Sequence, residues 1–200
     1  RPRPRVICSL RDVLSAPGTA EKEEWMLATF RRYVDQLLVH GDPAFLPLER
    51  SFPRAREIAE RTLYTGYVID PPSAARPGPG SGEVIVSTGG GAVAAPLIEA
   101  ALAARPLSPL AAAPWRILVG DNLSESQFEA YRRRAPAGVI VERARRDFPQ
   151  LLAAARLSIS QAGYNTVLEV LAAGIPAVVV PFAAADETEQ SLRARLLGER

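Results

Sequence analysis

The stretch Ser158-Ile-Ser-Gln-Ala-Gly-Tyr-Asn-Thr-Val-Leu-Glu-Val-Leu-Ala-Ala-Gly-Ile-Pro-Ala-Val-Val-Val-Pro181 has the pattern of a strand, a glycine turn, a short helix, a glycine stop and a second strand. Such a turn places the start of a helix at the carboxyl end of a strand. Backbone N–H groups without helical partners and the positive end of the helix dipole favour an anion such as a phosphate there. The stretch therefore predicts a βαβ unit with an anion-binding turn.

Two hypotheses account for the polar residues of this turn. Thr166 and Glu169 have the T-x-x-E spacing of a capping box, a purely structural role. Alternatively, Gly163 and Asn165 offer backbone donors to a phosphate while Glu169 turns toward a sugar hydroxyl. The spacing alone leaves both hypotheses open.

The chain after residue 82 alternates between strands rich in valine and isoleucine and helical stretches. The expected strands are 83–87, 115–119, 139–142, 157–160 and 177–181, and the expected helices are 92–104, 124–134, 148–155, 164–173 and 187–197. This alternation predicts an α/β fold, a Rossmann-like parallel sheet with helices on both faces. Ligands of such sheets bind at the carboxyl ends of the strands.

A second glycine loop follows the first of these strands. It contains three consecutive glycines, Gly89, Gly90 and Gly91. Glycine lets the backbone approach a ligand closely, and the helix behind the loop offers N–H groups to a phosphate. The spacing to Ala94 also fits the dinucleotide pattern G-x-G-x-x-G/A, although Glu99 and Asp121 are poorly placed as its acidic partner. A tight turn that binds nothing is the simpler alternative.

Polar residues also crowd the start of the last predicted helix. Asp186 is the expected N-cap, with Glu189 at the third helical position. Gln190 is not needed for capping, and its amide suits the mixed hydroxyls of a sugar. Because the carboxyl ends of parallel strands share one edge of a sheet, we expect all three loops to open toward one crevice.

The first part of the chain has too few elements for a complete layered domain. The expected elements are strands at 5–9, 35–39 and 62–69 and a helix at 20–33. A Pro/Gly-rich stretch at 71–82 is typical of a linker. The predicted domains are therefore 1–70, the incomplete end of one domain, the linker 71–82, and a ligand-binding domain at 83–200.

His40 is the single histidine and lies beside Asp42 at a predicted strand end. It could act as a general base near neutral pH, but anchoring a loop is the more common role of such a residue. The sequence has no Cys/His cluster, no D-x-D pair and no nucleophile elbow, so neither a metal nor covalent serine catalysis is expected.

Composition narrows the classes of protein further. The 200 residues are 48% apolar, the formal net charge is +2, and Cys8 is the single cysteine. We therefore expect a globular protein with a hydrophobic core, located in a reducing compartment, by default the cytoplasm. Nucleic acid is not an expected partner. The run 175–185 is shorter than the ~20 residues of a membrane span. Because the chain begins with arginine, it is expected to be a fragment.

These motifs together resemble the GT-B glycosyltransferases, specifically the C-terminal domain of glycosyltransferase family 28. The type member of that family transfers N-acetylglucosamine to a lipid-linked intermediate in peptidoglycan synthesis. The likeness covers about 83–197 and is strongest in the block 163–181, with its small-residue turn, T-x-x-E helix and A-G-x-P strand entry. Residues 5–70 look like the end of the acceptor domain.

The resemblance implies a site for a nucleotide sugar, usually a UDP-sugar. It places 89–91 and 163–166 at the diphosphate, Glu169 at the ribose hydroxyls, and the uracil near 143–148. It places Glu189 and Gln190 at the donor sugar, and it makes Gln161, at the start of the turn that contains Gly163, a further donor-binding residue. The turn Gln161-Ala-Gly-Tyr-Asn165 and the run Asp186-Glu-Thr-Glu-Gln190 depart from the family pattern, which leaves the identity of the sugar open.

The implied activity is inverting, metal-independent hexosyl transfer from a UDP-sugar, without a cofactor, to an acceptor hydroxyl. A lipid-linked acceptor and peripheral contact with the inner face of the membrane stay open. The main catalytic base is expected outside this chain, with His40 as a substitute, so the chain alone is expected to be inactive. The alternatives are a nucleotide-sugar 2-epimerase, a dinucleotide-binding oxidoreductase domain and a non-catalytic sugar-nucleotide sensor.

Overall fold

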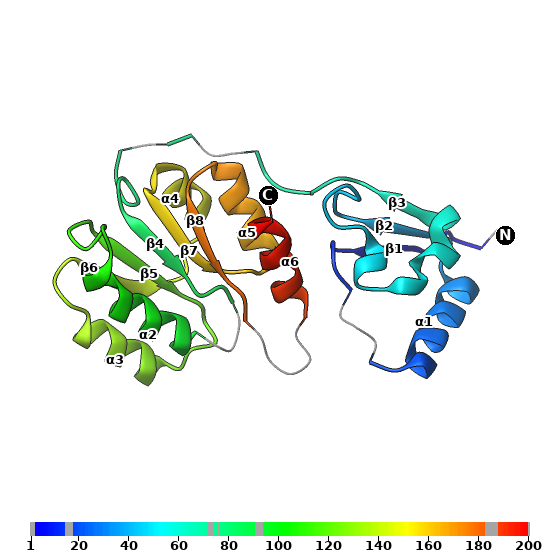
Figure 1. Cartoon of the computed structure of the whole chain (residues 1–200), viewed down its shortest axis with the longest axis horizontal. Helices are drawn as coiled ribbons and strands as arrows, with labels where there is room; N and C mark the ends of the chain where they lie inside the picture. Colours follow the sequence, from blue (N-terminus) through cyan, green and yellow to red (C-terminus); the bar gives the residue numbers. More distant parts are fainter. Residues whose placement is uncertain are drawn as a thin grey trace. The chain divides into compact units, whose positions relative to one another are not determined.

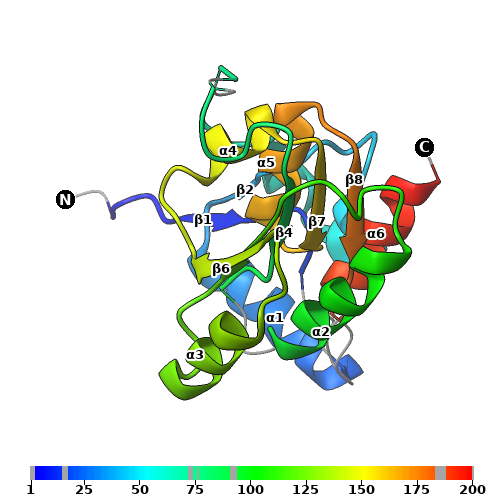
Figure 2. The same ribbon diagram turned by 90° about the vertical axis from the view of Figure 1, so that its left-hand side faces the viewer.

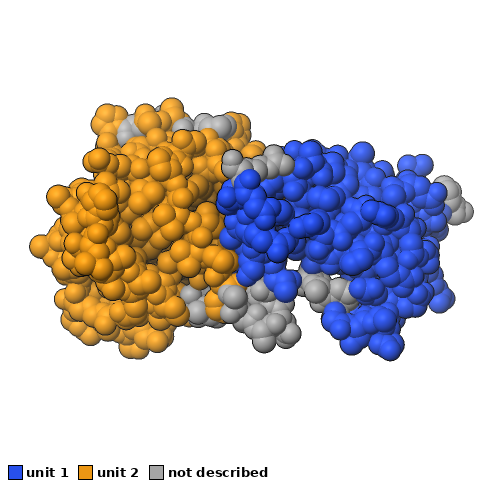
Figure 3. All heavy atoms as spheres, viewed as in Figure 1, with its two compact units in different colours: residues 1–68, 183–200 blue, residues 69–182 orange. Residues whose placement is uncertain are grey.

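The computed structural model describes residues 3–14, 18–71, 74–75, 77–90, 94–182 and 188–199. The chain forms two compact units, Arg1–Val68 with Ala183–Arg200 and Ile69–Phe182 (Figure 3). The chain therefore first passes from one unit to the other after Val68, next to the linker predicted at 71–82. The sequence prediction had assigned residues 183–200 to the ligand-binding domain, whereas in the structure they group with the first unit.

The second unit contains a five-stranded parallel sheet with the order β6-β5-β4-β7-β8 (Figure 1). Its strands are β4 Val84–Ser87, β5 Trp115–Val119, β6 Val139–Arg143, β7 Leu157–Gln161 and β8 Ala177–Val180. Its helices are α2 Ala95–Ala104, α3 Glu125–Arg134, α4 Phe148–Ala154 and α5 Tyr164–Ala173, with a 3₁₀ turn at Arg105–Leu107. The predicted α/β class is confirmed, and each predicted strand and helix of this region agrees with the structure within three residues.

The strand β4 shows why the sheet is covered on both faces. Val84 and Val86 pack with α2 and α3, whereas Ile85 packs with α4 and α5. Figures 1 and 2 show the two pairs of helices on opposite faces. Val84, Ile85 and Val86 are all fully buried, which is why the first three residues of the strand are apolar rather than alternating.

The strand β4 is also where the chain reverses direction across the sheet. From β4 the chain adds β5 and β6 on one side, and it then returns to add β7 and β8 on the other. Such a reversal leaves a crevice at the carboxyl ends of the central strands. Ser87 of β4 pairs with Ser160 of β7, so the loops after these two strands begin side by side.

A buried arginine of β5 bonds to β6 and to the residue directly before β4. Arg116 of β5 donates to both carboxylate oxygens of Glu83 at 2.7 and 2.8 Å and to Glu142 of β6 at 2.9 Å. Because Arg116 donates these bonds, the pKa of Glu83 lies below its ordinary value. Because Arg116 is buried, its guanidinium loses its hydration, and the ion pairs with the two carboxylates compensate for that loss.

The first unit contains a three-stranded parallel sheet with the order β1-β2-β3. Its elements are β1 Ile7–Leu10, α1 Ala20–Tyr33, β2 Gln36–Val39, 3₁₀ helices at Leu48–Arg50 and Pro53–Arg61, β3 Thr62–Tyr64 and the C-terminal helix α6 Glu189–Gly198. The sequence prediction missed the long 3₁₀ helix. It also made the third strand too long, because Gly66 adopts a left-handed φ of +72° just beyond Tyr64.

The two faces of this smaller sheet differ. Leu37 and Val39 are buried against α1 and the 3₁₀ helices. Ile7 and Leu63 point to the other face, where they are 55% and 51% exposed. Among the described residues, therefore, helices cover only one face of the first sheet.

A buried ion pair holds α6 in the first unit. Arg193 donates to both carboxylate oxygens of Asp12, at 3.0 and 2.7 Å, and both side chains are 2% exposed. The bidentate geometry compensates for burial of both charges. This pairing explains why the C-terminal helix groups with the first unit.

Candidate functional site

The loop after β4 is fastened to the loop after β5. The Thr88 hydroxyl donates to the Leu118 carbonyl at 3.3 Å and lies 3.3 Å from the backbone N–H of Gly120. Thr88 itself is fully buried. Gly89 then turns the chain with a left-handed φ of +60°, a conformation that L side chains rarely adopt. The first residues of the loop, Thr88 and Gly89, thus have defined partners and a defined backbone conformation.

Gly120 and Asn122 support this loop and were missed by the sequence analysis. A Cβ atom on Gly120 would lie 2.2 Å from the Gly89 carbonyl oxygen, so only glycine fits. The Asn122 amide donates to the Gly90 carbonyl. A glycine and an amide directly after the second strand of a parallel sheet are the signal that could have identified them.

The helix α5 begins earlier than the capping-box hypothesis requires. Its first residue is Tyr164. Its N-cap is Gly163, which makes no side-chain capping hydrogen bond. Thr166 is therefore the third helical residue, and Glu169 lies in the middle of the helix. The predicted capping box is wrong.

Packing explains this earlier start. The α5 face that packs on the protein core is formed by Tyr164, Val167 and Leu168, which are 6%, 3% and 8% exposed. Because Tyr164 is buried on this face, the helix begins at Tyr164. Gly163 precedes it in an extended conformation with φ −64° and ψ 144°. Asn165 is exposed at the second helical position. The first turn of α5, which starts from a glycine N-cap, therefore places the positive end of the helix dipole at the carboxyl end of β7.

Two glycines of these loops are not required by the fold. Gly90 and Gly163 do not have left-handed φ values, and a Cβ atom built on either would meet nothing within 4 Å. Glycine loses more conformational freedom on folding than alanine, at a cost of roughly 0.5–1 kcal/mol in regular structure. A ligand that approaches the backbone closely would explain why glycine occupies both positions.

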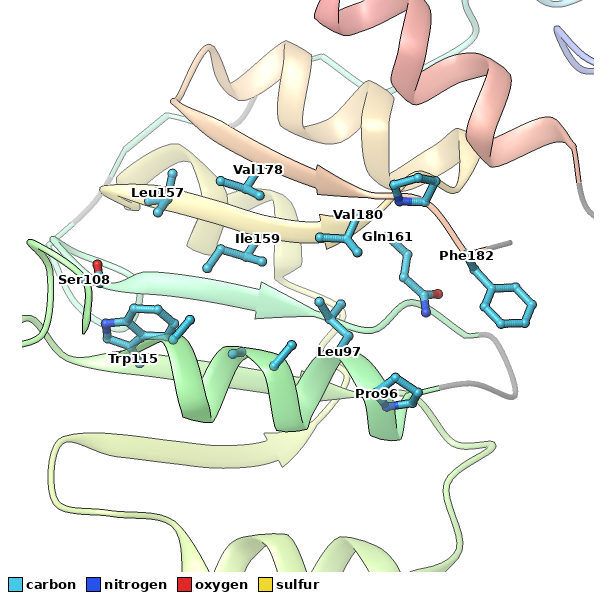
Figure 4. A pocket seen from close by; sticks show the side chains of 14 residues that line it. Pro96, Leu97, Ser108, Trp115, Leu157, Ile159, Gln161, Val178, Val180 and Phe182 are labelled. Atoms are coloured by element: carbon cyan, nitrogen blue, oxygen red, sulfur yellow. The ribbon is translucent and has the colours of Figure 1, made fainter. Parts of the chain in front are cut away.

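Gln161, the last residue of β7, lies near the start of the loop after β4. Its Oε1 atom lies 3.8 Å from the position of a Cβ built on Gly89. Figure 4 shows the Gln161 side chain at one end of a cavity of about 550 Å³ that α2, β7 and β8 line. Leu157, Ile159 and Val178 make the rest of this cavity largely apolar. The predicted residues Gly89 and Gln161 are thus brought together.

Glu169 is half-buried one turn beyond this edge of the sheet. Burial raises the pKa of its carboxyl group above the ordinary value, and the nearby carboxylate of Asp70 raises it further. No hydrogen bond or ion pair joins Glu169 to the residues that the structure describes. A carboxyl group without such a partner can accept or donate toward a bound hydroxyl.

The loop expected near the uracil is held by internal pairs. Arg143 donates to the carbonyls of Gly120 and Leu123 at 3.2 and 3.0 Å, and its guanidinium lies 4.2 Å from the centre of the Phe128 ring. Arg145 forms a bidentate pair with Asp147 at 2.8 and 2.7 Å. These arginines stabilise the loops after β5 and β6.

The remaining predicted donor residues lie in the first unit or outside the described residues. Gly91 and Asp186 are not described. The helix α6 begins at Glu189 with Thr188 as its N-cap, rather than near Asp186. Glu189 accepts a 2.7 Å bond from Arg193, and Gln190 is half-buried. Contact of Glu189 and Gln190 with a sugar stays a prediction.

His40 lies at the carboxyl end of the other sheet. Its Nε2 atom is 2.7 Å from the Ser9 hydroxyl, and its Nδ1 atom is 2.7 Å from the Thr65 hydroxyl. The ring therefore connects residues from all three strand ends of the first unit. These contacts anchor the ring, and they also place a basic nitrogen beside a hydroxyl.

Two further kinds of feature are absent from the ranges described above. No group of three or more His, Cys, Asp or Glu side chains there is arranged to hold a metal ion. No helix in those ranges is both long and apolar enough to cross a membrane.

Two curated relatives share 36% identity with parts of this chain, and both are named UDP-N-acetylglucosamine–N-acetylmuramyl-(pentapeptide) pyrophosphoryl-undecaprenol N-acetylglucosamine transferase. The protein of Sphingopyxis alaskensis aligns over 105 residues, 51% of this chain and 26% of that protein. The protein of Desulforudis audaxviator aligns over 67 residues, 34% of this chain and 18% of that protein. The chain thus matches only a minor part of either relative.

Solved structures share the fold. MurG of Acinetobacter baumannii superposes with a TM-score of 0.57 at 22% identity, over 98% of this chain and 51% of that one. Anabaena Alr3699/HepE, solved in complex with UDP-glucose, gives 0.58 at 14% identity, over 97% of this chain and 62% of that one. Residues 84–200 match the C-terminal domain of glycosyltransferase family 28. This match spans more than half of the chain, which therefore belongs to glycosyltransferase family 28 and has the GT-B fold.

Proposed function

We propose that the second unit binds the diphosphate of a nucleotide-sugar donor at the carboxyl ends of β4 and β7. The observation that carries the proposal is the pair Gly90 and Gly163, two glycines that neither backbone conformation nor packing requires. Both lie in loops that start side by side at the reversal point of the sheet. Close approach of a phosphate to the backbone would explain the presence of glycine at both positions.

The chemistry of glycosyl transfer fits such a site. As the bond between the anomeric carbon and the diphosphate oxygen breaks, negative charge grows on the leaving nucleoside diphosphate. Backbone N–H groups fixed at the start of α5 would stabilise that charge, and loss of one such donor typically costs ~3 kcal/mol of transition-state stabilisation. We propose that these backbone donors act without a divalent metal or a cofactor.

Glu169 is the residue that we propose for the ribose. It is half-buried, no described residue pairs with it, and it follows the anion-binding turn on the same helix. A carboxyl group in this state can bond a pair of vicinal hydroxyls without first breaking a protein contact. Burial, and after it the nearby carboxylate of Asp70, raises the pKa of Glu169.

The curated relatives suggest the donor and acceptor. Because their names specify transfer of N-acetylglucosamine from UDP-N-acetylglucosamine to a pyrophosphoryl-undecaprenol molecule, we propose UDP-N-acetylglucosamine as the first donor to test. A lipid-linked acceptor, reached from the cytoplasmic side of a membrane, is the first acceptor to test. The reaction would invert the anomeric centre through one direct displacement.

Calorimetric titration of the chain in EDTA with UDP, UDP-N-acetylglucosamine and NAD tests the donor site. We expect both uridine ligands to bind and NAD not to bind. Binding of NAD without UDP would instead support a dinucleotide-binding domain and overturn the proposal. Binding that appears only when Mg²⁺ replaces EDTA would overturn its metal-independent part.

Glycine variants separate binding from folding. Gly163→Val and Gly90→Ala should leave the free energy of unfolding within about 1 kcal/mol of the wild-type value, yet should weaken UDP binding by at least about tenfold because the new side chain occupies the phosphate's place. Gly198→Ala is the matched control, since its Cβ also meets nothing within 4 Å, and it should keep full affinity. Unchanged UDP affinity in Gly163→Val would contradict the proposed site.

A further inference from the structure

The three strand ends of the first sheet meet at the His40 ring. Ser9 belongs to β1, His40 directly follows β2, and Thr65 directly follows β3. The ring lies between the two hydroxyls, with Nε2 2.7 Å from Ser9 Oγ and Nδ1 2.7 Å from Thr65 Oγ1. Ser9 and Thr65 thus contact the same imidazole, although they lie 31 and 25 positions from His40 in the sequence.

Strand register explains why these side chains share a face. Ser9 pairs with Leu38, and Leu38 pairs with Leu63. Paired residues of parallel strands point the same way, and side chains two positions apart on one strand also do so. His40 and Thr65 therefore continue the face of Leu38 and Leu63, which is opposite to the buried core of Leu37 and Val39.

The surroundings of the Thr65 hydroxyl indicate which ring nitrogen carries the proton. A hydroxyl has one proton, and two backbone carbonyls lie within reach of it, Gly66 at 2.9 Å and Val39 at 3.4 Å. With its proton directed at a carbonyl, Thr65 accepts from the ring, and from this we infer that Nδ1 carries the hydrogen of the neutral ring. Nε2 is left with a lone pair, which accepts the proton of the Ser9 hydroxyl.

Backbone contacts hold this arrangement in place. The His40 N–H donates to the Leu10 carbonyl at 2.8 Å, and the Thr65 N–H donates to the Val39 carbonyl at 3.0 Å. Gly41 packs on Asp12 so closely that a Cβ would lie 3.2 Å from the Asp12 Cβ. The ring is thus fixed through its own backbone as well as through both hydroxyls.

We propose that His40 is a proton acceptor for a ligand hydroxyl, that Thr65 is the positioning residue that sets its tautomer, and that the Ser9 hydroxyl marks the place which the ligand's hydroxyl takes. The ligand class is an alcohol or sugar with a hydroxyl at this edge of the sheet. A neutral nitrogen with a lone pair binds an O–H donor, whereas it offers nothing to an anion.

The identity of this ligand as the acceptor rests on the proposed function. In that case the acceptor hydroxyl transfers its proton to His40 Nε2, and its oxygen forms a bond to the anomeric carbon of the donor sugar. The bond from that carbon to the diphosphate oxygen breaks, and the nucleoside diphosphate leaves with the electron pair. The imidazolium then returns its proton to water.

Nitrogen-15 NMR of the imidazole tests the tautomer. His40 is the only histidine, so a long-range proton–nitrogen spectrum contains one ring. At a pH about two units above the ordinary histidine pKa of ~6.5, we expect a protonated Nδ1 and an unprotonated Nε2. Thr65→Val should shift the ring toward the Nε2–H form, and Thr65→Ser should restore the wild-type spectrum.

Thr62→Val is the matched control, because the Thr62 hydroxyl bonds the Ile58 carbonyl and does not contact the ring. It should leave the ring signals unchanged. An Nε2–H tautomer in the wild-type chain, or a Thr65→Val spectrum identical to the wild type, would overturn the role of Thr65 and with it the proposal.

A sugar probe tests the hydroxyl site. Methyl N-acetyl-β-glucosaminide should move the Nε2 resonance of Ser9→Ala at lower concentration than that of the wild type, in which Ser9 competes. Ser81→Ala, a serine of the other unit, should respond like the wild type. An Nε2 resonance that the sugar does not move in Ser9→Ala would overturn the ligand site. Neither NMR experiment uses UDP, so failure of the donor proposal would be seen separately.

Discussion

The two parallel sheets of this chain present different chemistry at their carboxyl ends. The edge of the five-stranded sheet is made of backbone, with glycines at 89, 90 and 163 and the start of α5 at its glycine N-cap. The edge of the three-stranded sheet is made of side chains, with Ser9, His40 and Thr65 joined by hydrogen bonds. Backbone N–H groups suit an anion such as a diphosphate, whereas an imidazole beside hydroxyls suits proton transfer.

The difference matters because the two edges respond to different changes. A backbone site is damaged by adding atoms near the glycines, even when the fold is preserved. A side-chain site is damaged by removing one hydroxyl, even when its shape is preserved. The following variants test whether the two edges are as distinct as this comparison claims.

Arg116→Met is expected to have the largest effect, and only on the sheet with the backbone site. It leaves the carboxylates of Glu83 and Glu142 without their shared partner, and breaking a buried ion pair typically costs about 3–5 kcal/mol. Trp115 is 2% exposed in the neighbouring position of β5, so its fluorescence in a Trp25→Phe background reports urea unfolding of this unit. His40 ring signals that also changed in native conditions would weaken the comparison.

The same ion pair predicts a pH dependence. Arg116 lowers the pKa of Glu83 in the folded state, so the folded protein binds this proton less readily than the unfolded chain. The stabilisation is therefore present above the unfolded pKa of Glu, about 4.3, and is lost as the pH falls through the lower folded value. Urea midpoints of wild type and Arg116→Met should converge in this acidic range. A constant difference from neutral to strongly acidic pH would contradict this account.

Gly120→Ala is expected to damage the backbone site next. Its Cβ would lie 2.2 Å from the Gly89 carbonyl oxygen, so the glycine loop must move or the strand end must distort. Overpacking of this kind typically costs about 1–3 kcal/mol. Calorimetry should show UDP binding weakened at least about tenfold, while the His40 spectrum stays unchanged. Gly198→Ala again supplies the control, and full UDP affinity in Gly120→Ala would show that the loop has another purpose.

Glu169→Gln is expected to have the smallest effect on stability and an opposite effect on binding. Because burial and Asp70 raise the folded pKa of Glu169, ionisation costs more in the folded protein, and stability falls as the pH rises from the unfolded to the folded pKa. The amide removes this penalty, so the variant should be more stable at about pH 7 by up to about 1 kcal/mol.

The same variant should be no more stable than the wild type below the unfolded pKa of Glu169. UDP affinity should fall at about pH 7, since one carboxyl contact with the ribose is lost. A gain in stability without any loss of UDP affinity would contradict the proposed contact between Glu169 and the ribose. Denaturant titrations at several pH values, with calorimetry at one of them, distinguish these results.

The fold of the second unit could be read from the sequence because its signals are local. Continuous apolar strands such as 177–180 and glycine stops such as Gly174 identify their elements without any knowledge of partners. The bounds of α5 were predicted correctly at 164–173, but the T-x-x-E spacing wrongly suggested a cap at Thr166. Burial of Tyr164, a tertiary effect, starts the helix earlier.

The first unit was less predictable because its contacts are distant in sequence. Asp12 and Arg193 are 181 positions apart, so nothing local indicated that α6 would group with this unit. The partners of His40 lie on two other strands, and the sequence could identify only the histidine itself. The glycine loop after β4 was recognised, whereas its supports Gly120 and Asn122 came from the neighbouring strand end.

The central claim is that the two edges have separate roles, with the diphosphate at the backbone edge. The most direct measurement is a map of backbone amide shifts in the chain as UDP is added. We expect the largest shifts at residues 88–90, 120–122 and 161–166, with the strands β1, β2 and β3 unchanged. Shifts centred on Ser9, His40 and Thr65, or no response to UDP at all, would contradict the account.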